Sequence, residues 1–380
     1  MIIPALPAIQ EQTGVSEASV TWLLTAFLIV SSVATPLLGR LGDMYGKERL
    51  LVMVLLLFAA GSAICALGTH SIALMVAGRV VQGAAGALFP LSFGIIRDEF
   101  PRERVAQSIG LISSTFGIGG GVGLVLSGVF VDHLSLAALF WLAFGVTVVA
   151  AWATWRYVPE SPVRAPARID WGGGALLALA LSTLLLGVSR GPDWGWSSGR
   201  VLGLIAGGLA LAVAFVAWER RVPEPMVDMG LMARRAVWAP NLAAFAIGFA
   251  MFGSFILIPQ ITQAPESTGY GFGLNATQAG LVMVPSSIVM LIAGPLSGWL
   301  STRVGSRIPL AAGAAFAATS FAVLAAAHER LWTIVVGATL LGIGISLAFA
   351  AMANLVVAVV PATHVGVATG INAIMRSIGG

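Results

Sequence analysis

One arginine stands inside a long apolar run of this sequence, and its placement suggests chemistry more strongly than that of any other residue. Arg79 lies in Gly78-Arg-Val-Val-Gln-Gly83, within an apolar segment from Ile72 to Ile96. If the segment spans a membrane, a charge at that depth costs on the order of a few kcal/mol unless it faces a partner or a wet cavity. A guanidinium there can hold a nearby acid in its ionised form and so couple protonation to binding. The alternative is that Arg79 extends its charged head to the membrane surface.

A carboxylate set among glycines is the second chemical feature. Asp43 lies in Gly39-Arg-Leu-Gly-Asp-Met-Tyr-Gly46, between two apolar runs. Its carboxylate can accept hydrogen bonds from a helix N-terminus or from Arg97, which would make it a latch at one end of the molecule. Gly39 and Gly46 suit the tight turn around such a latch. A solvated loop acid is the alternative.

A third feature is the density of glycine between residues 117 and 128, which includes Gly119, Gly123 and Gly128. So many glycines disfavour an isolated helix. In a bilayer they permit bending and close contact between helices. The segment is therefore either a moving contact between two parts of the protein or a static one, and the sequence leaves both possibilities open.

Other kinds of site find no support in the sequence. The four histidines are scattered without metal-ligand spacing, and the single cysteine, Cys65, sits in an apolar run as a packing residue. There is no nucleotide-binding loop and no nucleophile motif. We therefore predict no catalytic residue, no metal site, no cofactor and no nucleic-acid partner.

The elements that carry these residues are apolar helices. Hydrophobic residues make up 58% of the 380 and charged residues only 9%, whereas soluble domains carry about 25% charged residues. A span needs about 20 mostly apolar residues. That criterion predicts eleven spans: Ala18–Leu38, Leu50–Leu67, Ile72–Ile96, Ala106–Val131, Ala137–Tyr157, Gly172–Val188, Val201–Trp218, Val237–Ile261, Ala276–Leu300, Ile308–Ala327 and Leu331–Val360.

Basic residues are distributed unevenly between the loops. Of the 20 lysines and arginines, fifteen fall in one set of alternate loops and only Arg190, Arg200 and Arg330 fall in the other. Arg79 and Arg376 lie within apolar segments. Loops rich in lysine and arginine stay in the cytoplasm, so the first set is expected to be cytoplasmic.

An internal repeat indicates two related halves. Gly39, Leu41 and Gly46 recur 259 residues later, and Pro101, Val105 and Gly110 recur 260 residues later, as Gly298, Leu300, Gly305, Pro361, Val365 and Gly370. The repeated loops are eight helices apart, so two helices are inserted between the halves. The predicted fold is an all-α polytopic membrane protein with an N-terminal bundle at 1–160, an inserted helix pair with linkers at 161–235 and a C-terminal bundle at 236–380.

These residues together resemble the major facilitator superfamily, and specifically its fourteen-helix drug:proton antiporters. The resemblance lies in the loop motif from Gly39 to Leu50, in the motif Gly78–Gly83 with Arg79 at its arginine position, and in the glycine motif from Gly119 through Gly128. It implies two bundles that expose a central cavity to each side in turn. Arg79 would serve in proton coupling. Asp43, Arg97, Gly39 and Gly46 would form a conformational gate, and Gly119, Gly123 and Gly128 a flexing helix.

The function implied by the resemblance is export of small hydrophobic or cationic drugs or natural products in exchange for protons. We expect no enzymatic activity, a multi-pass location in a bacterial inner or plasma membrane, a monomer, and three partners: the lipid bilayer, protons and a small hydrophobic substrate. A proton-coupled nutrient importer of the same fold and a degenerate non-transporting relative are the alternatives. Antiport and symport are both open.

The ends of the chain do not fit whole spans. Met1–Ile9 is apolar but too short to cross a bilayer, and Val365–Gly380 begins a span and stops midway. We number Met1–Ile9 as helix 1 and Val365–Gly380 as helix 13. We therefore expect helices 1 and 13 to be incomplete and helix 14 to be absent, so that these 380 residues form part of a longer transporter and do not transport alone. The acid that relatives carry in helix 1 would lie outside this chain.

Overall fold

The computed structural model describes residues 2, 5–163 and 170–380. All regular secondary structure within these residues is helical, which confirms the all-α prediction. Met1, Arg164 and Arg168, which entered the sequence expectations, lie outside the described residues.

Eleven spans are confirmed among the described residues, each long and apolar enough to cross a membrane. Two of them are interrupted within the bilayer. The eleven are formed by α2 (Glu17–Tyr45), α3 (Lys47–Leu67), α4 (Ile72–Gln82) with the 3-10 turn η2 (Gly83–Ala87) and α5 (Leu88–Glu99), α6 (Arg102–His133), α7 (Leu136–Tyr157), α8 (Trp171–Ser189), α10 (Gly199–Glu219), α12 (Arg235–Gln263), α13 (Ala276–Val282) with α14 (Val284–Val304), α15 (Arg307–Ala327) and α16 (Leu331–Val359).

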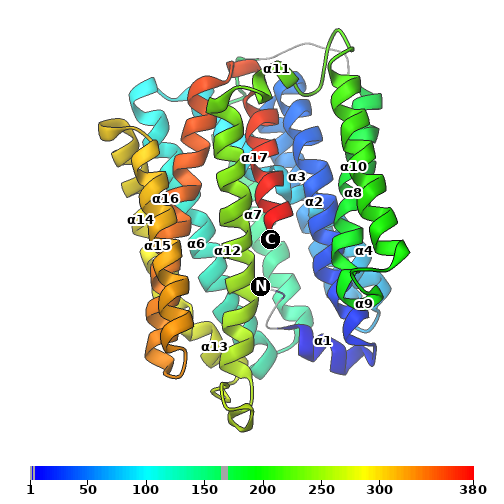
Figure 1. Cartoon of the computed structure of the whole chain (residues 1–380), viewed down its shortest axis with the longest axis vertical. Coiled ribbons are helices and arrows are strands. Elements are labelled where there is room, and N and C mark those ends of the chain that lie inside the picture. Colours follow the sequence, from blue (N-terminus) through cyan, green and yellow to red (C-terminus); the bar gives the residue numbers. More distant parts are fainter. Residues whose placement is uncertain (1, 3–4, 164–169) are drawn as a thin grey trace.

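Shorter helices fill the connections and the ends of the described chain. They are α1 (Leu6–Thr13), α9 (Gly191–Trp194), α11 (Met229–Met232), α17 (Val365–Gly379) and the 3-10 turns η3 (Glu266–Thr268) and η4 (Ala362–His364). Ile2, Ala5 and Ile9 are buried against Leu23 and Met75, and α1 lies at the lower end of the molecule in Figure 1. The first apolar segment thus packs under the ends of the following helices.

Local sequence signals explain many of the helix ends. The side chains of Ser135 and Asp170 accept hydrogen bonds from the amides of Ala138 and Gly173, at 3.2 and 2.8 Å, which satisfies free N–H groups at the starts of α7 and α8. Gly46, between α2 and α3, has φ +123°, a value that disfavours side chains. Its counterpart in the repeat, Gly305, has φ +84° between α14 and α15.

The long helices stand side by side along the long axis of the molecule (Figure 1). The α2–α3, α5–α6 and α14–α15 turns and α11 lie at the upper end, which we call the basic end because the arginine-rich loops belong to it. Helices α8 and α10 pack on each other, and α8 also packs on α2. The predicted inserted pair therefore stands beside α2 at the edge of the molecule.

Two helix crossings join the repeated segments in equivalent ways. A Cβ atom built on Gly39 of α2 would lie 2.6 Å from the carbonyl oxygen of Gly366 in α17. The repeat counterpart of Gly39 is Gly298 of α14, and a Cβ atom there would lie 2.6 Å from the carbonyl oxygen of Ala106 in α6. Each glycine is thus required by a backbone-to-backbone approach, and the two crossings are related by the offsets found in the sequence.

Candidate functional site

Arg79 is held by groups of the first three spans. Its Nε donates to the carbonyl oxygen of Leu23 at 2.9 Å, and its Nη1 donates to Oε1 of Gln82 at 2.7 Å. The guanidinium carbon lies 4.2 Å from the ring centroid of Phe27. Gln82 donates in turn to the Ser62 hydroxyl at 2.8 Å. No carboxylate of the described chain lies within ion-pairing distance of Arg79, so the acid expected beside it is not found among these residues.

The span that carries Arg79 breaks directly after it. The α-helix ends at Gln82, the 3-10 turn follows, and the α-helix resumes at Leu88. Gly83 and Gly86 lie in this turn against α2: a Cβ atom on Gly83 would lie 2.6 Å from Cβ of Val30, and one on Gly86 would overlap the hydroxyl of Ser31. The break lies where these two glycines pack closely against α2, and apolar periodicity gave no sign of it.

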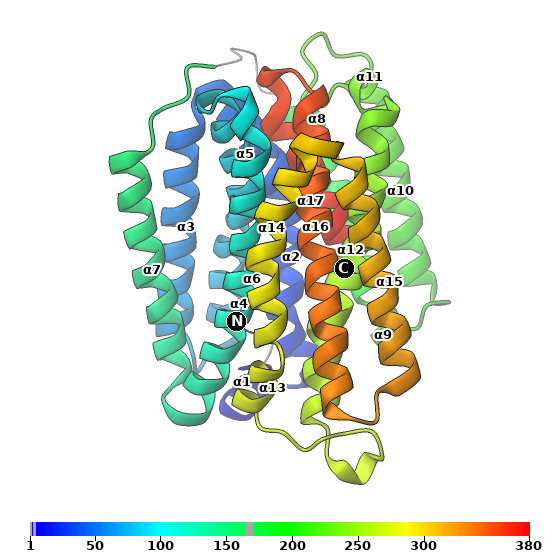
Figure 2. The ribbon, with the colours of Figure 1, turned by 90° about the vertical axis from the view of Figure 1, so that its left-hand side faces the viewer.

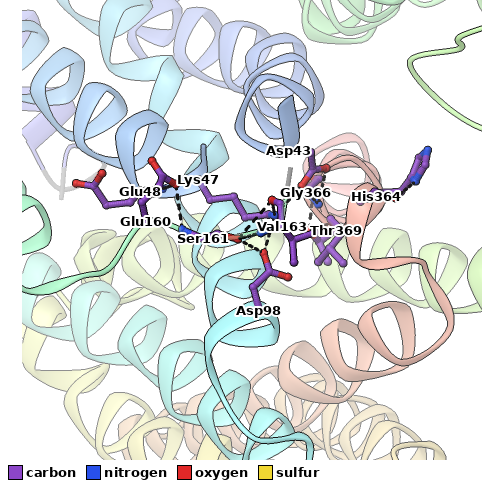
Figure 3. A network of polar contacts seen from close by, with 12 residues as sticks. Asp43, Lys47, Glu48, Asp98, Glu160, Ser161, Val163, His364, Gly366 and Thr369 are labelled. Carbon is purple, nitrogen blue, oxygen red and sulfur yellow. Dashed lines mark hydrogen bonds and ion pairs between the residues drawn. The ribbon is translucent and has the colours of Figure 1, made fainter. Parts of the chain in front are cut away.

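Asp43 is fully buried at the basic end, where α2 meets α17 (Figure 3). Its Oδ2 accepts a hydrogen bond from the amide of Gly366 at 3.1 Å. Gly366 is in the first turn of α17, where the helix dipole favours a negative charge. The repeat counterpart of Asp43 is Thr302, whose hydroxyl donates to the carbonyl oxygen of Trp299 in its own helix. The polar latch is therefore present in one of the two equivalent crossings.

A buried ion-pair network lies beside the latch. Nζ of Lys47 is 3.4 Å from Oδ1 of Asp43 and 2.7 Å from Oδ2 of Asp98, and these side chains have no exposed surface. The Ser161 hydroxyl donates to the same Asp98 oxygen at 2.5 Å. The neighbouring Glu160 accepts from the amide of Glu48 at 3.3 Å. The segment after α7 thus closes over the α2–α3 turn (Figure 3).

Of the residues in this network, only Asp43 was predicted from the sequence to take part in a contact. Lys47 lies four residues after Asp43 but across the α2–α3 turn at Gly46, so helical spacing alone does not bring their side chains together. Asp98 follows Arg97 at the end of a span, but nothing in the sequence indicated that it meets Lys47. Ser161 lies in a connecting segment without a motif. These contacts depend on tertiary packing.

Arg97 does not donate to Asp43 but to a backbone carbonyl of another helix. Its Nη1 donates to the carbonyl oxygen of Val357 in α16. Nearby, Nδ2 of Asn354 donates to the carbonyl oxygen of Ala106 at 3.3 Å. Together with Asp43 and Gly366, these pairs make three polar links at the basic end, each joining the segment 1–160 to the segment 236–380. Of the two donors considered for Asp43, the structure places the helix N-terminus against it.

The glycines of α6 divide into two groups. Gly128 packs against the backbone of α13, and a Cβ atom there would lie 2.7 Å from the amide nitrogen of Thr277. Gly119 has no neighbouring atom within 4 Å of that position, and Gly123 is buried. The other close glycine contacts along α6 are those of Gly110, Gly117 and Gly121 with α14. Gly128 thus serves helix packing, whereas Gly119 leaves space around the helix.

An aromatic cluster joins helices from both segments. Phe89 and Phe93 of α5, Phe116 of α6, Phe255 of α12 and Phe349 of α16 have ring centroids 5.3–6.5 Å apart. The guanidinium carbon of Arg376 in α17 lies 4.2 Å from the centroid of Phe349. Arg376 has no ion pair within the described residues. The sequence showed that Arg376 lies in an apolar segment but not which aromatic rings surround it.

Comparison with known proteins agrees with this architecture. The family model described as Major Facilitator Superfamily matches residues 1–380. Multidrug resistance protein Stp of Mycobacterium tuberculosis (strain CDC 1551 / Oshkosh) is 30% identical over 99% of this chain and 69% of its own length. The tetracenomycin C resistance and export protein of Streptomyces glaucescens is 27% identical over 99% of this chain and 69% of that protein.

Among solved structures, the human organic anion transporter MFSD10 has the same fold. Its TM-score is 0.68, over 98% of this chain and 80% of that chain, at 16% identity. The likeness extends through the helices that hold the latch, the network and the aromatic cluster. Because the family model covers the whole chain, this protein belongs to the Major Facilitator Superfamily and is a multi-pass membrane transporter, not an enzyme.

Proposed function

We propose that this protein exports small hydrophobic or cationic drugs or natural products in exchange for protons, by alternating access. The observation that carries the proposal is the aromatic cluster, which receives rings from α5, α6, α12 and α16 and so belongs to both segments of the chain. Flat aromatic faces bind apolar and cationic molecules without a fixed hydrogen-bond pattern. The drug-resistance names of the two relatives support the same substrate class.

The latch supplies a way to close the basic end. Within the described residues, the three polar links named above cross between the segments there, and each joins a side chain to a backbone group. One hydrogen bond contributes on the order of 1 kcal/mol, or about 1.5–3 kcal/mol when one partner is charged. Links of this strength can stabilise the state in which the basic end is closed and still allow that end to open. We assign the gate to Asp43, Arg97, Gly39 and Gly46, and the bending of α6 to Gly119 and Gly123, with Gly128 as its contact point.

Proton coupling is assigned to Arg79. Its guanidinium is fixed by Leu23, Gln82 and Phe27 at the start of the span that breaks at Gly83. A change in this hydrogen bonding would move the turn Gly83–Ala87, which touches α2. The acid that would act on Arg79 is not among the described residues; its protonation would reach the helix that carries Asp43 through this turn. The lipid bilayer, protons and a small apolar substrate are the partners in this scheme, and the protein acts as a monomer.

The test uses everted membrane vesicles that contain the protein expressed from its complete reading frame. Imposing an inside-acid pH gradient should drive accumulation of the cationic dye ethidium, and collapsing the gradient should release it. Arg79→Ala should remove the accumulation at equal protein level. Accumulation driven only by an inside-alkaline gradient would instead favour the alternative of a proton-coupled importer.

A further inference from the structure

A groove lies between α2 and the inserted helix α8, away from the aromatic cluster. It has a volume of about 450 Å³ and is lined mainly by aliphatic side chains, among them Val30, Leu37 and Leu41 of α2. Its polar lining consists of Arg40, Asp170 and Ser182. A nearly apolar groove with one guanidinium matches the shape and charge of an anionic amphiphile.

Arg40 is a buried charge whose Nη1 atom has no bonded partner among the described residues. The residue is 8% exposed, and its Nη1 makes no hydrogen bond. No ion pair involves Arg40 within the described part of the chain. A buried donor that loses water without gaining an acceptor carries a desolvation cost, and the cost is larger for a charged group. An acceptor supplied from outside the chain would remove it.

Most carboxylate oxygens around Arg40 already accept from other groups, and one oxygen of Glu219 does not. Asp170 accepts from the amide of Gly173 at 2.8 Å and from Nε1 of Trp218 at 3.0 and 3.1 Å. Asp43 is bonded to Gly366 and Lys47. Glu219 accepts from the amide of Val227 through one oxygen, while its other oxygen is buried without a partner and is not part of the groove lining.

The depth of Arg40 suits a lipid headgroup. Arg40 lies five residues before the end of α2 at the basic end, which is about 7 Å below that end at a rise of 1.5 Å per residue. Trp171, which also lines the groove, is 74% exposed. Exposed tryptophans concentrate at the level of the headgroups. The guanidinium is therefore at the depth of lipid phosphates, and the aliphatic part of the groove extends from it along α2.

We propose that this groove binds one anionic phospholipid, with its phosphate on Arg40 and an acyl chain between α2 and α8. The acyl chain holds the lipid in the groove but leaves one apolar environment for another in every phospholipid, so it does not distinguish one lipid from another. Selectivity then comes from the headgroup: a phosphate of net negative charge offers Arg40 a charge-assisted acceptor. The bound lipid would join the inserted helix pair to the helix that carries Asp43.

The experiment measures lipid binding to the purified chain in a neutral detergent by native mass spectrometry. The probes are phosphatidylglycerol and phosphatidylcholine of equal chain length, and glycerol 1-phosphate as a headgroup without chains. Arg40→Gln removes the proposed contact and Arg40→Lys keeps the charge. Arg307→Gln removes an exposed arginine of the basic end as the matched control, and Ala34→Phe fills the groove while leaving Arg40 in place.

The proposal expects one retained phosphatidylglycerol, bound about fivefold to tenfold more tightly than phosphatidylcholine. Arg40→Gln should abolish this preference, Arg40→Lys should keep most of it, Arg307→Gln should keep all of it, and Ala34→Phe should lower retention of both lipids. An unchanged preference in Arg40→Gln would overturn the proposal. Binding of glycerol 1-phosphate as tight as that of the lipid would also overturn it, because the site would then be a phosphate site. If Arg40→Gln does not fold, Ala34→Phe decides, and unchanged retention contradicts the proposal.

Discussion

Asp43→Asn isolates the electrostatic part of the latch. Asparagine keeps an oxygen that can accept from the amide of Gly366, so the change replaces a charged hydrogen bond by a neutral one, a difference of about 1 kcal/mol. It also removes a negative charge from the first turn of α17, which contributes about 0.3–1 kcal/mol. Lys47 keeps Asp98 at 2.7 Å. Because Lys47, Asp43 and Asp98 belong to the same segment, that pair exists whether the basic end is open or closed.

The closed state should therefore lose about 1–2 kcal/mol, which is a shift of roughly fivefold to thirtyfold toward the open state. Spin labels on Tyr45→Cys and Arg307→Cys, both exposed at the basic end, would report the distance across it once Cys65 is replaced by alanine. The longer-distance population should rise in Asp43→Asn. Transport should slow, with substrate affinity unchanged, because Asp43 is not part of the aromatic cluster.

Thr302→Val is the matched control, since Thr302 occupies the equivalent place in the repeat and bonds within its own helix. It should leave the distance distribution unchanged. An unchanged distribution in Asp43→Asn, or an equal shift in Thr302→Val, would refute the latch. A large loss of substrate affinity with normal cycling would place Asp43 in the substrate site instead.

Four further predictions concern the network, the coupling residue, the glycine contacts and the basic end. Asp98→Ala leaves Lys47 with the Asp43 carboxylate at 3.4 Å and the carbonyl oxygen of Val163 at 3.5 Å, so thermal unfolding should show a loss of about 3 kcal/mol, and adding Lys47→Met should recover part of it. Arg79→Ala should abolish proton-coupled dye efflux without reducing membrane insertion, while Arg79→Lys should retain part of the efflux because the charge remains and the planar fork is lost; wild-type efflux in Arg79→Ala would favour the surface-extension alternative. Gly128→Ala should cost about 1–3 kcal/mol because its Cβ meets the backbone of Thr277, whereas Gly119→Ala should not destabilise; equal melting temperatures would contradict the contact. The pKa of His364 is lowered by burial first and by the charge of Arg40 next, so Arg40→Gln should raise the pKa of His364 in an NMR titration, and a pKa that stays or falls would contradict their proximity.

The spans were predictable because hydropathy alone determines them. The predicted start of α16 at Leu331 and the predicted ends of α7 at Tyr157 and α15 at Ala327 match the structure, since apolar runs stop where charged or turn residues begin. The start of α2 and the end of α6 differ by one or two residues from prediction, as expected for helix ends. The end of α2 was predicted wrongly: the helix continues from the predicted end at Leu38 to Tyr45, because the polar residues of its last turns are buried rather than in a loop. The interruption at Gly83–Ala87 was missed, because alanine and glycine keep the run apolar whether or not the helix is regular.

For the site, the sequence allowed individual residues to be predicted but not the partners that they contact. Asp43 was identified from its glycine setting, but whether it meets a helix N-terminus or Arg97 depended on how α2 crosses α17. Gly119 and Gly128 were predicted as members of one motif, and only the packing distinguishes Gly128, which meets α13, from Gly119, which has no neighbour within 4 Å of its Cβ position. The cluster of Phe116, Phe255 and Phe349 joins three helices that are far apart in sequence. Periodicity describes one helix at a time and cannot indicate such a meeting.

The most direct test of the proposed exchange is proton counterflow in proteoliposomes that hold the protein from its complete reading frame and enclose the pH indicator pyranine. Adding ethidium outside, without an imposed gradient, should move the dye inward and protons outward, so the lumen becomes alkaline, and Arg79→Ala should abolish this change at equal reconstitution. Ethidium entry without a pH change, or with acidification of the lumen, would contradict antiport.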